Sequence, residues 1–319
     1  MKRTSFSSIA IARGIDALSL GFVALLCMLA IFFHARIEHA SATLVELMKA
    51  GVLYAFAVFL ADKVPLRFGF AIRIAASLAL LSFLFQAVEP MQHLLVEGWL
   101  DEPMIAFERS LLGFESSTAM QHFVHPVLTE WIMFSYVAYV PLLAIVALVC
   151  YRSKGGEGLN DYLFHLTAVN ILCGIGFILF PIASPMFHFP QEFTVPLHGW
   201  FFTACGEWMR ANLHYPGGSL PSPHCAAGTI MMVMLYRYNR RWFIATAPIF
   251  GTIYVAIVYG RYHYIEDGIA GIIVALLVVR YSHRVIPFFE QAYNAVTQPL
   301  RGIVYSFINL SHSIRRVSS

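Results

Sequence analysis

The sequence predicts an all-α, polytopic membrane bundle with about eight transmembrane helices, each needing roughly 20 mostly apolar residues. Of the 319 residues, 59% are hydrophobic and only 12% are charged, and the mean hydropathy is +0.68. No polar block is long enough to form a soluble domain, and there is no internal repeat of the kind that many transporters carry. This composition is typical of a protein that crosses the bilayer several times.

The first third of the chain contains three expected spans. They lie at residues 15–33, 47–61 and 69–88. Because basic residues precede the first one, it resembles a signal peptide, with Ala40-Ser41-Ala42 as a cleavage site. Four polar residues separate that tripeptide from the apolar run: His34, Arg36, Glu38 and His39. We therefore expect the first span to be retained, so that residues 1–66 form two N-terminal transmembrane helices.

Residues 89–130 are acidic rather than apolar. Asp101-Glu102-Pro103 suits the start of a helix, and apolar residues then recur at helical spacing. We expect a helix that either lies in the membrane interface or caps a site. His122 and His125 are three residues apart, but a pair without a clear third ligand does not predict a metal site.

Two more spans are expected at residues 131–151 and 163–180, separated by a Gly-rich turn that carries Arg152 and Lys154. Residues 181–221 are rich in Pro, Gly and aromatic residues, and we expect a long loop that covers the site and helps to select the substrate.

The remaining spans follow that loop. Residues 217–271 hold two apolar runs, and the last span covers residues 267–279, with Pro287 expected to end its helix. Residues 286–319 have the pattern of a basic amphipathic tail suited to a membrane surface.

Polar clusters stand at the outer ends of the two apolar runs within residues 217–271, and we expect a turn between the runs to bring them to one membrane face. The first cluster is Ser219, Ser222 and His224, and the second is Arg261, His263, Glu266 and Asp267. Ser222 suits an N-cap and Pro223 the first position of a helix, whose free N–H groups and partial positive charge favour a bound phosphate.

His263 and Asp267 are four residues apart, which would place them on one helix face. A carboxylate there bonds one imidazole nitrogen and leaves the other free to attack or to transfer a proton. Both clusters could instead mark no more than the membrane interface, but their matched Ser, His, Arg and Asp side chains favour a site.

The two clusters resemble motifs of a known family. Pro221-Ser222-Pro223-His224 and the stretch His263-Tyr264-Ile265-Glu266-Asp267, followed by Gly271, look like the second and third motifs of the type 2 phosphatidic acid phosphatase superfamily. The second stretch is most similar to its lipid phosphotransferase branch, which includes inositol phosphorylceramide synthase. The resemblance covers roughly residues 67–285 and implies a six-helix phosphatase-like core there.

Roles for single residues follow from the resemblance. It implies that His263 is the nucleophile, Asp267 its orienting partner, and His224 the acid that protonates the leaving group. Ser222 would bind phosphate, and we add Ser219, Arg210 and Arg261 as further phosphate-binding candidates.

The chain also departs from the family pattern. The third-motif arginine commonly stands six residues before the histidine, where this chain has Ile257; Arg261 would lie one helical turn closer on a similar face. The first motif usually supplies a Lys and an Arg, and the corresponding residues 180–185 contain neither. Fewer cations at the phosphate tilt the prediction toward the transferase branch.

The expected activity is phosphoryl transfer from a membrane lipid phosphate or phosphodiester, through a phosphohistidine and without a cofactor or metal. Water as the second acceptor makes a phosphatase, and an alcohol such as inositol makes a transferase. A metal-dependent membrane hydrolase and a non-enzymatic lipid transporter are the alternatives. Nothing in the sequence indicates a nucleic-acid partner.

The basic residues predict the orientation in the membrane. With the N-terminus, the loops after spans two, four and six, and the C-terminus on one side, that side holds all but five of the 21 basic residues; the five are Arg36, Lys49, Arg109, Arg210 and Arg261. The positive-inside rule then places both termini in the cytoplasm and both polar clusters at the periplasm, exterior or lumen. Cys205 and Cys225 would share that outward side, where pairing is left open.

Overall fold

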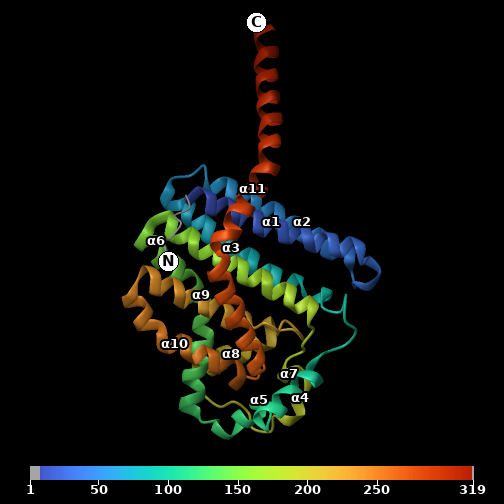
Figure 1. Ribbon diagram of the computed structural model, residues 1–319, viewed down its shortest axis with the longest axis vertical. Helices are drawn as coiled ribbons and strands as arrows, with labels where there is room; N and C mark the ends of the chain where they lie inside the picture. The colour runs from blue at the N-terminus through green and yellow to red at the C-terminus, as the bar shows by residue number, and fades with distance from the viewer. Residues whose placement is uncertain (1–7, 318–319) are drawn as a thin grey trace.

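Six helices of the computed structural model, which describes residues 8–317, are long and apolar enough to cross a membrane. They are α1 (Ser8–Phe32), α2 (Ala40–Ala61), α3 (Leu66–Ala87), α6 (Pro126–Leu179), α10 (Arg240–Tyr259) and α11 (Ile265–Val317). Within residues 8–317 every regular element is a helix (Figure 1). The all-α class and the multi-pass membrane character predicted from composition are therefore confirmed.

The number of spans differs from the expected eight because of two helices. Helix α6 has 54 residues and covers two expected spans, but Lys154 (φ −144°, ψ 17°) and Gly155 (φ 58°, ψ −144°) leave the helical region inside it. The break falls in the predicted Gly-rich turn. Helix α9 (Pro223–Tyr238) has 16 residues, or about 24 Å, less than the roughly 30 Å of a bilayer core. The count of eight stays a prediction.

The N-terminal helices α1, α2 and α3 are part of the same bundle as the later ones. Helix α1 packs on α2, α6 and α11, and these helices lie side by side in Figure 1. A buried contact joins them: both Nη atoms of Arg73 on α3 donate to the Asp16 carboxylate on α1, at 3.0 and 3.3 Å, and Tyr54 on α2 donates to the same carboxylate at 3.0 Å. Arg73, which the charge argument assigned to the cytoplasmic side, thus lies within a helix and is paired.

The last helix continues beyond its expected end. Helix α11 passes Pro287, so the prediction that this proline ends the helix is wrong. Proline removes one i→i−4 hydrogen bond and costs about 3 kcal/mol in a helix interior, which a long helix can absorb. The apolar and basic side chains of the predicted amphipathic tail beyond residue 297 lie outside the described side chains.

Short helices gather at the end of the bundle opposite the C-terminal part of α11 (Figure 1). They are α4 (Asp101–Leu112), α5 (Ser116–Ala119), α7 (Pro185–His188) and α8 (Phe201–Leu213), with 3₁₀ turns at His34–Arg36, Glu89–Met91, Met120–Phe123 and Pro190–Glu192. Helix α4 begins at Asp101 as predicted. Its Phe107, Leu111 and Leu112 are exposed, as expected of a helix in a membrane interface.

The segment 181–221 is more ordered than the expected loop, because it contains the 13-residue helix α8. Glu130 on α6 stabilises the start of α8: its carboxylate accepts the N–H groups of Trp200 (2.7 Å), Phe202 (2.6 Å) and Thr203 (3.1 Å). These are the N–H groups that a helix start leaves unpaired, and a carboxylate there also complements the helix dipole.

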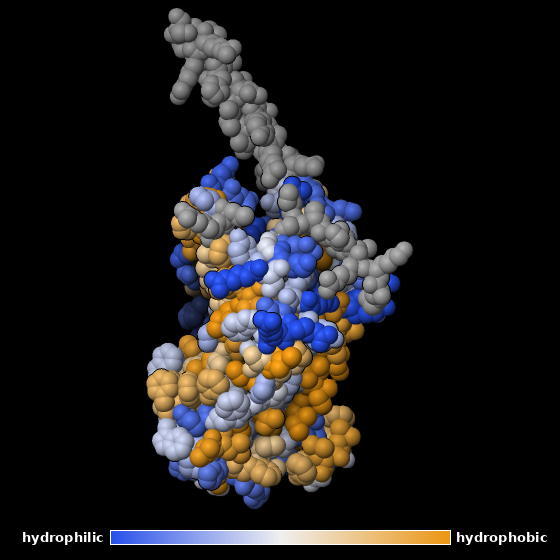
Figure 2. Space-filling model, turned by 90° about the vertical axis from the view of Figure 1, so that its left-hand side faces the viewer, coloured by the Kyte–Doolittle hydropathy of each residue, from blue (hydrophilic) through white to orange (hydrophobic). Residues whose placement is uncertain are grey.

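The surface is divided along the long axis. Figure 2 shows hydrophilic side chains gathered in the upper part of the body, hydrophobic side chains over much of the body below them, and a few more hydrophilic ones at its lower end. Large exposed apolar residues on the spanning helices, such as Phe32, Val52 and Ile244, agree with a lipid-facing surface.

Candidate active site

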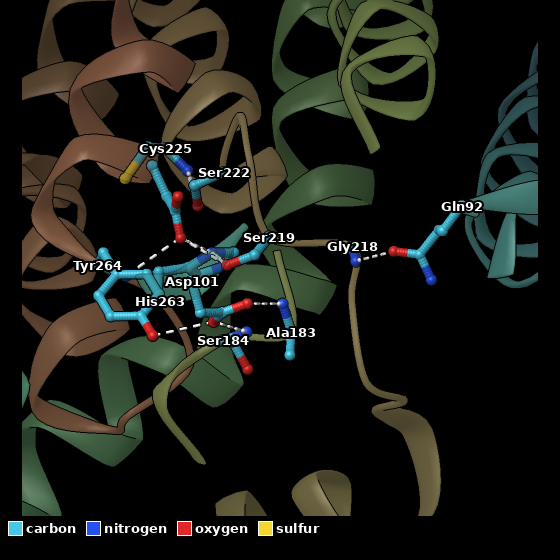
Figure 3. A network of polar contacts seen from close by, with 11 residues as sticks. Gln92, Asp101, Ala183, Ser184, Gly218, Ser219, Ser222, Cys225, His263 and Tyr264 are labelled. Carbon is cyan, nitrogen blue, oxygen red and sulfur yellow. Dashed lines mark hydrogen bonds and ion pairs between the residues drawn. The ribbon is translucent and has the colours of Figure 1, made fainter. Parts of the chain in front are cut away.

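Three side chains of the two polar clusters meet in one buried network (Figure 3). Ser219 Oγ donates to Asp267 Oδ2 at 2.5 Å, and His263 Nδ1 lies 3.3 Å from the same oxygen. Ser219 Oγ is also 3.1 Å from His263 Nδ1, and the Tyr264 N–H donates to Asp267 Oδ2 at 3.1 Å. The carboxylate therefore fixes Nδ1 as the protonated nitrogen of His263 and leaves the lone pair on Nε2.

The network depends on close packing between the starts of α9 and α11. Ser222 caps α9 as predicted, its hydroxyl accepting from the Cys225 N–H at a long 3.5 Å, and its own N–H donates to the Asp267 carbonyl at 2.8 Å. Gly271 permits the approach, since a Cβ there would stand 2.4 Å from the Ser222 carbonyl oxygen. The glycine quoted with the third motif thus has a packing role.

The predicted pairing of His263 with Asp267 is present, but the reason given for it is wrong. Helix α10 ends at Tyr259 and α11 begins at Ile265, so His263 lies in the connecting turn and not on a helix face. The N–H groups of Tyr262 and His263 both donate to the Ile257 carbonyl, at 2.9 and 3.0 Å, and fold the turn back against α10. Asp267, in the first turn of α11, then reaches back to the imidazole.

His224, in the first turn of α9, faces His263 with 5.9 Å between ring centroids. Its ring packs against Tyr136 at 4.9 Å and against Tyr139 at 4.6 Å. Within the part of the chain that the structure describes, its buried Nδ1 has no hydrogen-bond partner. A buried nitrogen without a partner is uncommon in proteins.

A stack of aromatic rings supports His224, and sequence reasoning missed it. Tyr136 stacks on Tyr262 at 4.4 Å, Tyr262 stacks on His214 at 5.0 Å, and the Tyr136 hydroxyl is 2.8 Å from His214 Nε2. Because His214 Nδ1 lies 3.1 Å from the Met209 carbonyl, Nδ1 carries the proton and Nε2 accepts from Tyr136. Burial lowers the pKa of His214 below its ordinary value of 6.5. No local pattern marks Tyr136, which lies 88 residues before His224.

Asp101 anchors the turn that carries His263 and Tyr264. Its carboxylate accepts the N–H groups of Ala183 at 2.7 Å and Ser184 at 3.1 Å, and the Tyr264 hydroxyl at 2.9 Å (Figure 3). Burial raises the pKa of Asp101, while these hydrogen bonds oppose that rise. The sequence marked Asp101 only as a helix start. Asp101 also ties α4 to residues 180–185, the stretch that corresponds to the first motif.

Gln92 holds the turn that presents Ser219. Its side chain accepts the Gly218 N–H at 2.8 Å and donates to the Pro216 carbonyl at 3.2 Å (Figure 3). Gly217 (φ 112°) and Gly218 (φ 65°) both lie in the left-handed region, which side chains other than glycine rarely adopt. The glycine pair and Gln92 together set the position of the Ser219 hydroxyl.

The two candidate arginines do not contact the histidines. Arg261 has a left-handed backbone (φ 69°), donates from Nη2 to the Val195 carbonyl and lies over the Phe193 ring, 4.4 Å from its centroid. The expectation that Arg261 lies one helical turn beyond position 257 on a similar helix face is therefore wrong, because α10 ends at Tyr259. Arg210 on α8 is bonded to Glu207 at 2.7 and 2.9 Å.

Both arginines line a cavity of about 410 Å³ between the α7 segment, α8 and the α10–α11 turn. Its walls are Met186, Pro190, Phe193, Thr194, Pro196, Leu197, Glu207, Arg210, Gly260 and Arg261. The candidate residues thus separate into a histidine network and a neighbouring arginine cavity. Cys205 and Cys225, whose pairing was left open, are both free thiols.

Comparison with known proteins gives one match. The PAP2 superfamily matches residues 102–281, more than half of the 319 residues, and the matched range holds both polar clusters. No curated protein and no solved structure matches the chain. The match begins within α4, so the expected core boundary at residue 67, and with it the division into residues 1–66, 67–285 and 286–319, stays a prediction. The chain belongs to the PAP2 superfamily, whose members are phosphatases and phosphotransferases.

Proposed function

We propose that the protein is an integral-membrane enzyme that removes or transfers the phosphoryl group of a lipid phosphate through a phosphohistidine at His263. The observation that carries the proposal is the bonding of His263 Nδ1: the Asp267 carboxylate lies 3.3 Å away, and Ser219 holds that carboxylate at 2.5 Å. A carboxylate on one imidazole nitrogen raises the basicity of the other, as a nucleophile requires.

The first step joins His263 to the substrate. His263 Nε2 attacks phosphorus, the phosphorus–nitrogen bond forms, and the bond from phosphorus to the lipid oxygen breaks. His224, whose ring lies 5.9 Å from the His263 ring, donates its proton to that leaving oxygen. General acid assistance of this kind typically contributes roughly 10²–10⁴-fold.

The second step frees the enzyme. A water or alcohol oxygen attacks phosphorus, the phosphorus–nitrogen bond breaks, and His224 takes the proton from the attacking oxygen. Water releases inorganic phosphate, and an alcohol such as inositol makes a new phosphate ester. The protein groups are the same in both cases, so the acceptor alone separates a phosphatase from a transferase.

The amino end of α9 is the place we propose for the phosphoryl oxygens. The partial positive charge of a helix start favours an anion there, and Ser222 at the cap and Ser219 beside His263 border this position. Positioning and charge neutralisation carry most of the catalysis in phosphoryl transfer. We propose, from the distribution of basic residues, that this end of the bundle faces away from the cytoplasm.

The test uses the purified full-length protein and a panel of radiolabelled lipid phosphates, with and without alcohol acceptors. We expect release of phosphate or transfer to the alcohol, full activity in the presence of a chelator, and no activity in His263→Ala. His122→Ala, which changes an exposed histidine outside the network, is the matched control and should keep wild-type activity. Loss of activity with the chelator would favour the metal-dependent hydrolase instead, and full cellular function in His263→Ala would favour the transporter.

A further inference from the structure

We propose that the cavity of about 410 Å³ beside the catalytic turn binds a second anionic group, a phosphate or carboxylate on a small polar headgroup, separate from the phosphoryl group at His263. This inference rests on the proposed function for the reaction, but the cavity itself is defined independently of it. Neither His263, His224 nor Asp267 lines the cavity, while Arg210 and Arg261 both do.

Arg261 is the cavity cation without a carboxylate in contact among the described side chains. No carboxylate lies within 4.0 Å of its guanidinium in the described part of the chain, where its contacts are the Val195 carbonyl and the Phe193 ring. It is partly buried; burial and the nearby charge of Arg210 lower its pKa, while the charge of Glu207 opposes that fall. A partly buried guanidinium without a counter-ion is unfavourable, and an anion with two oxygens matches its fork.

Arg210 is the second cation of the cavity, and it forms an ion pair with Glu207. The two are three residues apart on α8, with distances of 2.7 and 2.9 Å. With Arg261 the cavity lining carries two positive charges and one negative charge, a net charge of +1. A bound anion would compete with the Glu207 carboxylate for Arg210, so Glu207 limits the affinity of the cavity for anions.

The rest of the cavity suits the carbon skeleton of a headgroup. Met186, Phe193 and Leu197 provide apolar walls, and Thr194 adds a hydroxyl. Its volume is at the lower end of the 300–1,000 Å³ that small-molecule sites usually have. Such a space admits a glycerol or polyol framework with one charged group rather than a lipid chain.

The cavity is also close to the catalytic network along the chain. Arg261 stands two residues before His263, and Tyr262 between them packs on Tyr136, the ring that supports His224. Two residues of extended chain span at most about 7 Å. A molecule anchored at Arg261 can therefore present a second group at His263, as part of either the lipid donor or a soluble acceptor alcohol.

The first experiment measures binding without turnover. Glycerol 3-phosphate is titrated by calorimetry into detergent-purified, full-length His263→Ala protein. We expect saturable binding that Arg261→Gln weakens about 10- to 100-fold, since hydrogen bonds to charged groups are the stronger ones. Arg36→Gln is the matched control, because Arg36 also donates to a backbone carbonyl, that of Leu94 at 3.0 Å, but lies outside the cavity.

A second variant keeps the test decisive if Arg261→Gln folds poorly. Glu207→Gln removes the competing carboxylate, so glycerol 3-phosphate should bind up to about fivefold more tightly. Equal binding by the Arg261→Gln and Arg36→Gln proteins, or weaker binding by Glu207→Gln, would overturn the proposal.

Kinetics then distinguish the two sources of the anion. A higher KM for the lipid donor alone in Arg261→Gln assigns the cavity to the donor headgroup, and a higher KM for the acceptor alone assigns it to the acceptor. If Arg261→Gln changes neither the KM for the donor nor the KM for the acceptor, the cavity is not part of the substrate site. A wild-type protein that turns over no lipid but still binds glycerol 3-phosphate through Arg261 would contradict the proposed function and leave the anion site standing.

Discussion

The side chain of Asp267 reaches back from the first turn of α11 to His263 in the preceding turn, with 3.3 Å between Oδ2 and Nδ1. The same oxygen accepts the Ser219 hydroxyl and the Tyr264 N–H, and Asp267 is fully buried. One carboxylate thus joins the turn before α9 to the turn before α11. A single-atom change at Asp267 tests this arrangement.

We expect Asp267→Asn to lower kcat by about 10²–10⁴-fold while the protein remains folded, because an amide orients the imidazole less well and stabilises its positive charge poorly. Glu266→Gln, a change of the neighbouring carboxylate in the same helical turn, is the control and should retain most of the activity. If the two variants have similar rates, Asp267 does not orient the nucleophile.

The proposed role of His224 as the general acid predicts that its loss affects substrates differently according to the leaving group. His224→Gln should lose about 10²-fold with a lipid phosphate, whose alkoxide needs a proton, but less than about tenfold with a p-nitrophenyl phosphate, whose leaving group does not. His198→Gln serves as the control histidine. An equal loss with both substrates would point to a role in binding or packing.

The buried His214 predicts a dependence of stability on pH. Because its folded pKa lies below 6.5, the unfolded chain takes up a proton first, and the stability that His214 provides is present above pH 6.5 and lost as the pH falls below it. His214→Gln can still accept the Tyr136 hydroxyl and should show a smaller fall of Tm between pH 8 and pH 5. Parallel curves for both proteins would show that His214 does not contribute.

Asp101 is expected to support the site from a distance. Asp101→Ala leaves three buried donors unpaired, at roughly 1–3 kcal/mol each, and should lower both Tm and kcat. Tyr264→Phe removes one of these donors together with its contact and should have a much smaller effect on both. The control is Glu102→Ala, which changes the neighbouring, exposed carboxylate that pairs with His188. A wild-type kcat in Asp101→Ala would show that Asp101 does not position the turn that carries His263.

The predicted orientation is tested by labelling. In a cysteine-free background, a cysteine at the exposed Trp200 should react with a membrane-impermeant maleimide from outside intact cells, and one at the exposed Arg240 should react only after lysis. The opposite pattern would reverse the orientation and place the site in the cytoplasm.

Local patterns explain which features could be predicted from the sequence. Ser222 and Asp101 were correct as helix starts because a cap depends on residues next to it in the chain. Helix α8 was missed because its cap is Glu130, 70 residues before Trp200. The position of Arg261 was predicted wrongly because α10 was expected to continue past Tyr259. The helix ends there, so Arg261 does not share a helix face with position 257.

Contacts between distant residues were not predictable in this way. Nothing near Tyr136, Gln92 or Asp101 in the sequence indicates that each lies against the catalytic turns, because the folded bundle brings them there. The pairing of His263 with Asp267 was correct for another reason: a spacing of four residues allows contact on a helix, and here a turn that folds back allows it as well.

The most direct test of the phosphohistidine is to trap it. The full-length protein is mixed with a ³²P-labelled lipid phosphate, quenched in base within milliseconds and analysed for label on the protein. The account predicts a label that is stable to base and labile to acid, mapped to the peptide containing His263, absent from His263→Ala and present in His122→Ala. A label on another residue, or an active enzyme in which His263→Ala turns over substrate at the wild-type rate, would contradict it.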